Sequence, residues 1–396
     1  MPATEFQSSF LGRISIRRNQ IASMDGHHEQ DLEDLDLFQK HIADRFAELL
    51  SPSSSSDDHR PQDSLLSISW LSQLLDVFLC CEAEFKAVLI MGRDPSQISK
   101  PPLDRLIPEL LDRVVKALDI CNAVCVGIES VRHYQRVAEI AVFALEHKPL
   151  GDGNVRRAKR ALTSLVSGIT TEDKDTGGNK STERTWSFGR RGGSGAPIKG
   201  GPTGHFRSLS WSVAKNWSAA KQIQAMSTNL VAPRGGESSF LASLVYVMST
   251  VVVFVMWILV AAIPCQERNG LATHLPVPKQ LSWAPSLIGL QEKIGEEWKK
   301  KEKKGSAGLL EEMQRIEKLS QCLVELVDSF QFPLEAEKEE EMATKVAELS
   351  ATCRKMDEGL MPLQVQIREV FHRIVRSRTE ILEALEQAGK VSAPAM

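Results

Sequence analysis

The chain has 396 residues, of which 42% are apolar and 25% charged, and its formal net charge is −3. This composition allows a packed core and gives no overall charge that would select nucleic acid as a partner. The chain holds two tyrosines, and its prolines and glycines cluster between apolar segments, which favours helices over sheets. We therefore predict an all-α protein.

The seven cysteines include no C-x-x-C pair. The absence of such a pair argues against a zinc site, and the scattered cysteines do not resemble a secreted disulfide framework. We expect reduced thiols, buried as small apolar groups in a cytosolic protein.

The first half of the chain is predicted to be helical after a flexible N-terminus of residues 1–27, with a helical bundle over residues 28–170. The stretch "DLEDLDLFQKHIADRFAELL" has apolar residues at steps of three and four, which is typical of an amphipathic helix. A more apolar helix follows and stops at Gly92. A long helix is expected from Leu103 to about His147, and "VRRAKRALTSLVSGI" adds a shorter basic one.

Residues 171–205 differ in composition, being rich in Gly, Ser, Thr and Lys without periodicity. They are predicted to form a disordered basic linker. Ser187, in this linker, and Ser210 each follow an arginine by three residues, a pattern that basophilic kinases use. Phosphate at either serine would cancel local positive charge and weaken contact with lipid.

Residues 206–232 are predicted to contain a basic amphipathic helix. In one interpretation its tryptophans dip into a lipid headgroup region while its cations meet anionic lipid. In the other it is an ordinary bundle helix with a solvated basic face. The side chains concerned are Arg207, Trp211, Lys215, Trp217 and Lys221.

The most hydrophobic segment is residues 240–264, inside an uncharged run from Ser238 to Gln266. About 20 apolar residues suffice to span the hydrocarbon of a bilayer, so the segment is a transmembrane candidate. The alternative is a central core helix, since a helix surrounded by others is apolar all round. The membrane-inserting candidates are Phe240, Leu244, Val247, Val251, Phe254, Trp257, Ile258 and Val260.

A Pro-rich loop is expected over residues 265–285, followed by a coiled-coil-like helical region over residues 286–390. We expect Pro333, Gly359 and Pro362 to divide this region into three helices. These lengths favour an antiparallel bundle over a long rod. The whole chain is thus predicted to be an elongated multi-helix bundle with one very hydrophobic central helix.

Enzyme signatures are missing from the sequence. "GGNKST" lacks the glycine spacing of a phosphate loop, and no G-x-G-x-x-G, H-E-x-x-H or G-x-S-x-G motif occurs. We therefore expect no catalytic residues, no metal, no cofactor and no small-molecule substrate.

Five blocks of the sequence resemble the plant BYPASS/ROH-type family of helical proteins. They are "SSFLGRISIRRNQ", "HEQDLEDLDLFQKHIADRFAELL", "SISWLSQLLDVFLCCEAEFKAVL", "LDRLIPELLDRVVKALDICNAVCVGIE" and "FRSLSWSVAKNWSAAKQIQAM". The resemblance implies a protein without known enzymatic activity that binds the exocyst subunit touching the plasma membrane. It also implies a role in tuning polarised secretion.

Two functions remain open from the sequence. The first is a non-enzymatic adaptor of secretion at the cytosolic face of the plasma membrane or of secretory vesicles, with a cytosolic pool and lipid contact. The second is a membrane-anchored structural or signalling protein, single-pass through residues 240–264. In that case a homo-oligomer would form through the C-terminal coiled coil.

Overall fold

The computed structural model describes residues 24–50, 64–90, 98, 100–171, 217–233, 239–265, 270–302, 308–330 and 335–391. Within these ranges the chain forms helices and no strand, so the predicted all-α class is confirmed. The helices are α2 (Met24–Leu50), α3 (Ile68–Ile90), α5 (Leu103–Glu146), α6 (Asp152–Thr171), α7 (Ala219–Ser227), α8 (Phe240–Ala262), α9 (Ala284–Glu302), α10 (Glu311–Asp328) and α11 (Ala336–Val391).

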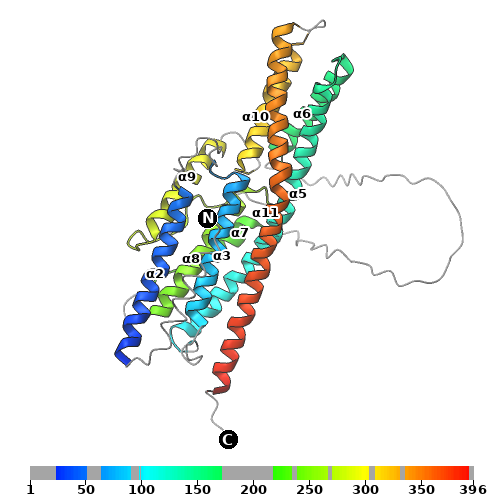
Figure 1. Cartoon of the computed structure of the whole chain (residues 1–396). Coiled ribbons are helices and arrows are strands. Elements are labelled where there is room, and N and C mark those ends of the chain that lie inside the picture. Colours follow the sequence, from blue (N-terminus) through cyan, green and yellow to red (C-terminus); the bar gives the residue numbers. More distant parts are fainter. Residues whose placement is uncertain are drawn as a thin grey trace, which may run out of the picture.

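The bundle is elongated, as predicted, and α11 runs along most of its length (Figure 1). This helix has 56 residues, which corresponds to about 85 Å at a rise of 1.5 Å per residue. It packs against α5 in antiparallel fashion: Glu129 of α5 meets Gln364, whereas the later Arg132 meets the earlier Met361. One end of the body consists of the α5–α6 and α10–α11 hairpins, and α2, α3, α8 and α9 lie toward the other (Figure 1).

The predicted break within α11 is wrong, because Gly359 and Pro362 lie inside one continuous helix. Proline at an interior position removes one backbone hydrogen bond, a cost of about 3 kcal/mol. The apolar stripe nevertheless continues in register across it, with Leu360 and Leu363 both buried. Gly359 serves a close approach instead, since a Cβ there would lie 2.7 Å from the Ile68 side chain of α3. Pro333 lies outside the described residues.

The core is one continuous cluster to which α2, α3, α5–α11 all contribute. The predicted division into an N-terminal bundle and a C-terminal region therefore describes chain order and does not separate two cores. Helix α8 lies inside this cluster and packs against α5, α3, α7 and α2. Because α8 has apolar side chains on every side, each of its faces has to be buried against another helix.

The C-terminal end of α8 is held by backbone groups far away in sequence. Leu309 donates its N–H toward the carbonyls of Ala261 and Ala262, at 3.0 and 3.1 Å, and Leu310 donates to Ala262 at 3.0 Å. Carbonyls in the last turn of a helix have no partner within the helix, so these bonds satisfy groups that would otherwise be buried unpaired. Gly308 permits the approach, because its φ is +82° and a Cβ at this position would lie 2.6 Å from the Ala262 oxygen.

Helix α5 also approaches this end of α8 closely. A Cβ on Gly127 would overlap the carbonyl oxygen of Pro264 and come within 2.7 Å of the Ile263 side chain. Both neighbours belong to the segment that directly follows α8. The crossing of α5 and the α8 terminus therefore depends on a residue without a side chain.

We predict that Gly127→Ala lowers the free energy of unfolding by about 1–3 kcal/mol, because the methyl group must displace backbone in a packed core. Gly153→Ala is the matched control, since Gly153 also lies in a helix but has nothing within 4 Å of its Cβ position. It should be neutral or stabilising by about 0.4–1 kcal/mol. Urea unfolding of both variants measures the difference, and equal effects would contradict the close crossing.

Candidate functional site

All eight membrane-inserting candidates lie inside the bundle. Phe240 is 8% exposed and the other seven are at most 1% exposed. Among the described residues, α8 is long and apolar enough to cross a membrane, with a mean hydropathy of 2.6 in its most apolar window, and that window is entirely buried. The arrangement is that of a core helix, the second of the two interpretations of this segment.

Specific contacts fix the aromatic side chains of α8. The Trp257 indole N–H donates to the carbonyl of Ala272 at 2.8 Å. Phe254 meets Phe46 of α2 edge to face, with ring centroids 5.7 Å apart, and Tyr246 lies against Trp283 at 6.3 Å. These contacts come from α2 and from the segment before α9, so both elements cover α8 directly.

The basic helix predicted over residues 206–232 differs from the observed structure. Trp217 and Ser218 are not helical, and α7 starts at Ala219 with the Ser218 hydroxyl accepting from the N–H of Lys221. A serine that satisfies this N–H in an extended conformation favours a helix start at the next residue. A continuous helix over residues 206–232 is therefore wrong, because the chain is not helical at Trp217 and Ser218.

The interfacial candidates separate into two groups. Trp217 is half-buried against the core, and Lys221 is exposed. Trp217 therefore contributes to packing, while Lys221 belongs to a solvated face. Arg207, Trp211, Lys215 and the phosphorylation candidates Ser187 and Ser210 lie outside the described residues.

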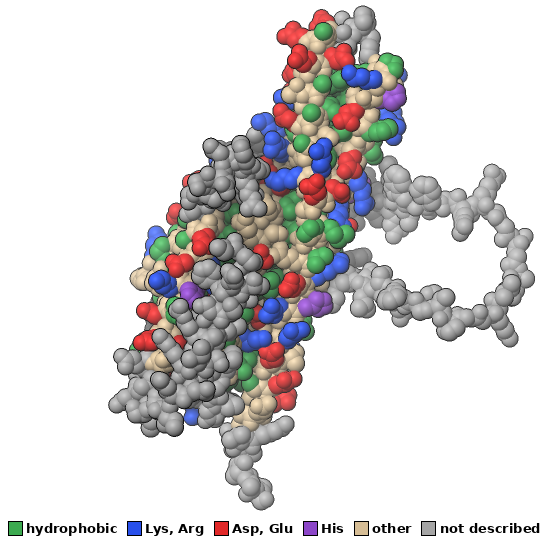
Figure 2. All heavy atoms as spheres, in the orientation of Figure 1, with side chains coloured by type: hydrophobic (Ala, Val, Ile, Leu, Met, Phe, Trp, Pro, Cys, Tyr) green, Lys and Arg blue, Asp and Glu red, His purple; other side chains and the backbone are tan. Residues whose placement is uncertain are grey.

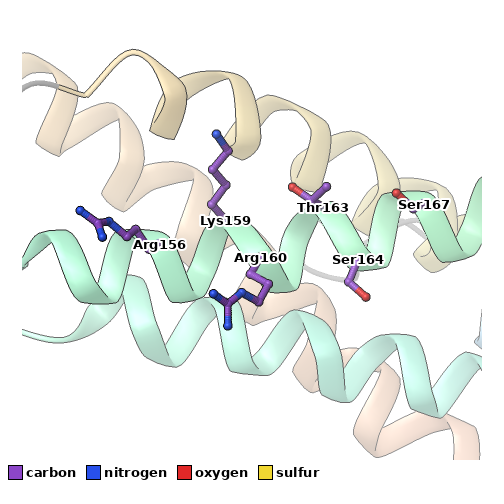
Figure 3. A pocket seen from close by; sticks show the side chains of 6 residues that line it. All are labelled: Arg156, Lys159, Arg160, Thr163, Ser164 and Ser167. Carbon is purple, nitrogen blue, oxygen red and sulfur yellow. The ribbon is translucent and has the colours of Figure 1, made fainter.

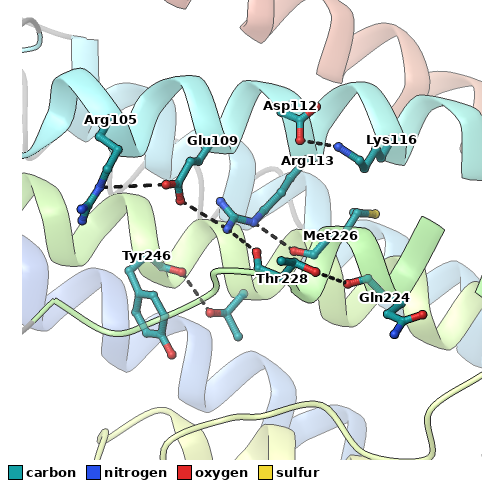
Figure 4. A network of polar contacts seen from close by, with 10 residues as sticks. Arg105, Glu109, Asp112, Arg113, Lys116, Gln224, Met226, Thr228 and Tyr246 are labelled. Carbon is teal, nitrogen blue, oxygen red and sulfur yellow. Dashed lines mark hydrogen bonds and ion pairs between the residues drawn. The ribbon is translucent and has the colours of Figure 1, made fainter. Parts of the chain in front are cut away.

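A buried arginine of α5 holds the end of α7 (Figure 4). Arg113 is 5% exposed, and its Nε donates to the carbonyl of Met226 at 3.0 Å. One Nη donates to the carbonyl of Thr228 at 3.2 Å and lies 3.5 Å from Glu109. A cation at a helix C-terminus satisfies carbonyls and opposes the negative end of the helix dipole. Arg113 thereby ties the end of α7 to α5.

Two buried carboxylates also have structural partners. Glu312 accepts from the N–H of Ile68 with both oxygens at 3.2 Å, and Lys355 lies 3.0 Å away. Burial raises the pKa of Glu312, and Lys355 partly offsets that rise. Burial also acts to raise the pKa of Glu84, but hydrogen bonds from His41 and Arg45 outweigh it and lower that pKa. Both carboxylates tie helices together.

Two thiols of α5 lie in surroundings that raise their pKa. Burial raises the pKa of Cys121 to about 12, and it raises that of Cys125, which shares a small pocket with Arg368 and His372 between α5 and α11. A protonated thiol is a poor nucleophile and a poor metal ligand. Across the described ranges, no group of three or more His, Cys, Asp and Glu could hold a metal ion.

An apolar surface on α11 lies beside α5, which we call the seam patch and define as Met361 and Val365. These side chains are 53% and 55% exposed. Met361 and Val365 are one turn apart on α11, and Arg132 reaches Met361 from α5 at 3.5 Å. On the face shown in Figure 2, hydrophobic side chains interrupt the charged ones along α11. Exposed apolar clusters with polar rims are typical of protein contacts.

The sequence matches a family model described as "Protein ROH1-like" over residues 1–385. The chain belongs to the ROH1-like family. It is similar to Protein ROH1A of Arabidopsis thaliana, with 64% identity over 413 residues and 99% of each chain covered. It is also similar to Protein ROH1D of the same plant, with 44% identity over 405 residues, covering 97% of this chain and 98% of the relative. No solved structure matches.

The family match confirms the resemblance predicted from the five sequence blocks. In this ROH1-like chain the sequence interpretation missed Arg113, Glu312 and the seam patch. Arg113 could have been found, because a cation stands among the apolar positions of the stripe that faces the core. Glu312 could not, since its partner N–H is 244 residues away.

We predict that Arg113→Ala lowers the free energy of unfolding by about 2–3 kcal/mol, because it leaves two carbonyls without their charged donor. Arg105→Ala is the control. Its side chain is 61% exposed and pairs with Glu109 at 3.9 Å, and an exposed ion pair contributes about 1 kcal/mol or less. Urea unfolding of the two variants is the measurement. If Arg113→Ala lowers the free energy of unfolding no more than Arg105→Ala does, the contacts of Arg113 with the end of α7 do not stabilise the fold.

Proposed function

We propose that this ROH1-like protein is a non-enzymatic adaptor of polarised secretion in plants that binds an exocyst subunit at the cytosolic face of a membrane. The observation that carries the proposal is the seam patch. It lies on the longest pair of helices in the described structure, whose buried faces are already used in the core. What remains exposed there is free to meet a partner.

The geometry of the seam suits a helical partner. Two antiparallel helices present a shallow groove between their ridges, and a third helix can lie along it with apolar side chains at steps of three and four. Methionine adapts its shape to such contacts. Glu129, Arg132 and Gln364 surround the apolar centre and would set the orientation of the partner, as polar rims do in protein interfaces. We therefore expect the exocyst subunit to bind the seam patch through the apolar face of a helix.

The burial of α8 supports peripheral membrane association. A membrane anchor would have to leave contacts with α2, α3, α5 and α7, and would leave an empty core behind. In the proposed function α8 is a core helix, and the protein reaches the membrane through its partner and through lipid headgroups.

The anchored, oligomeric alternative is less well supported by the packing of α11. Its apolar stripe is buried within the chain, against α3, α5 and α10. An oligomer built on that stripe would need the bundle to open. The stripe members are Met342, Val346, Leu349, Cys353, Met356 and Leu360.

We predict that Met361→Glu/Val365→Glu weakens binding of the full chain to the purified exocyst subunit at least about tenfold, because two charges would have to be buried in an apolar interface. Both side chains are more than half exposed, so the fold should be retained. Titration calorimetry gives the affinity, and thermal unfolding checks the fold.

The control carries the same charge change elsewhere: Leu32→Glu/Val231→Glu, at positions that are 52% and 62% exposed. Its affinity should stay within about twofold of the wild type. Equal affinities for the seam variant and the control would remove the seam patch as the binding surface. No binding by the wild-type chain would contradict the proposed partner.

A further inference from the structure

The end of the α5–α6 hairpin combines exposed cations with exposed apolar side chains. We define the hairpin tip as residues 140–164. It contains five Lys or Arg and two acids, Glu146 and Asp152, which leaves it at +3. This local excess stands out in a chain whose total net charge is −3. The cations are Lys148, Arg156, Arg157, Lys159 and Arg160.

Two of these five cations have no counter-ion in the described part of the chain. Arg156 pairs with Asp152, Lys159 with Asp328, and Lys148 lies 3.9 Å from Glu339. Arg157 and Arg160 are exposed and form no ion pair with any described residue. Their charge is available to an external anion.

Exposed apolar side chains lie at the same end. Phe143 is 67% exposed and Ile140 is 43% exposed. Phe143 is three residues before the end of α5, and Arg157 is five residues after the start of α6. At 1.5 Å per residue both are within about 8 Å of the turn, measured along the helices. Hydrophobic, cationic and histidine side chains gather at this end in Figure 2.

The cations of α6 border a depression of about 390 Å³ together with hydroxyl groups of the next two turns (Figure 3). Guanidinium, ammonium and hydroxyl groups all donate hydrogen bonds, and none of the lining side chains is acidic. Such a set suits phosphate oxygens. The lining residues are Arg156, Lys159, Arg160, Thr163, Ser164 and Ser167.

We propose that the hairpin tip docks on an anionic phospholipid bilayer, with Phe143 at the boundary of headgroups and acyl chains and Arg157 and Arg160 on lipid phosphates. A bilayer meets both requirements of the tip at once, since it offers anionic charge over an apolar layer. The inference deepens the proposed function and rests on it for its purpose, because it supplies the membrane contact that the adaptor needs.

The neighbouring hairpin sets the direction of approach. Lys148 meets Glu339, which places the start of α11 beside the tip. Residues 335–341 contain five Glu and one Lys. An anionic surface repels this acidic segment, so the bilayer contacts the α5–α6 side of the end of the bundle.

The test is co-sedimentation of the full chain with phosphatidylcholine vesicles, with and without about 20% phosphatidylserine. The wild type should bind the anionic vesicles, and salt of about 0.5 M should release it because ionic screening weakens such contacts. Arg157→Gln/Arg160→Gln should lower the partition coefficient about 30-fold, from about fivefold per charge. Phe143→Ser should lower it about tenfold and leave its salt dependence unchanged.

A control variant, Lys40→Gln/Arg376→Gln, removes two exposed cations from α2 and α11 and should bind vesicles like the wild type. The tip variants should keep their affinity for the exocyst subunit, and the seam variant should keep its affinity for vesicles, so the two proposals fail separately. Wild-type protein that does not prefer anionic vesicles would overturn the inference. Tip variants that bind vesicles as well as the control would also overturn it, and would point to a soluble acidic partner for this end.

Discussion

A helix that is apolar on every side has to be buried, and this requirement determines how the neighbouring helices are placed. Helix α8 carries no charge in 23 residues, so water can be excluded from it only by neighbours on all sides. Contacts from α2, α3, α5 and α7 supply this cover. These helices then turn their second faces to α6, α9 and α11, which extends the bundle outward from α8. In this view α5 is long because it covers α8 and continues beyond it to form the hairpin end, and α11 packs along α5.

Polar groups make this arrangement specific. Apolar packing alone would allow α8 to slide along its own axis, because one Val or Leu resembles the next. Backbone hydrogen bonds from Leu309 and Leu310 hold its C-terminal end, and Arg113 of α5 holds the end of α7, which itself packs against α8. The indole of Trp257 adds a third fixed point. Each of these bonds satisfies a group that would otherwise be buried without a partner, so each favours a single register.

Periodicity and helix-ending residues were enough to predict most helices. The long helix was expected from Leu103 to about His147 and runs from Leu103 to Glu146, and the hydrophobic helix begins at Phe240 as expected. Periodicity was not enough at Pro362, where packing against α3 and α5 outweighs the local preference to stop. Periodicity also failed at Ser218. The apolar residues keep their helical spacing on both sides of Ser218, but its side chain caps the start of α7.

The candidate surfaces were harder to predict than the core. Met361 and Val365 lie outside the apolar stripe of α11 that faces the core. From sequence alone, apolar residues in such positions are the available indication of an exposed apolar surface. The sequence does not tell that Arg132, more than 200 residues earlier, lies against Met361. The hairpin tip is similar: the basic run of α6 is visible in the sequence, but the exposure of Phe143 follows only from how α5 packs.

We propose that α8 is a core helix and that the protein associates with membranes peripherally. Alkaline carbonate extraction of membranes from plant cells expressing the full chain distinguishes this from insertion of α8. Carbonate strips proteins held by charge or by a partner and leaves bilayer-spanning helices in place. We expect release of the protein into the supernatant, in a form that is folded after return to neutral pH. Retention in the membrane pellet would contradict it and would place α8 in the bilayer.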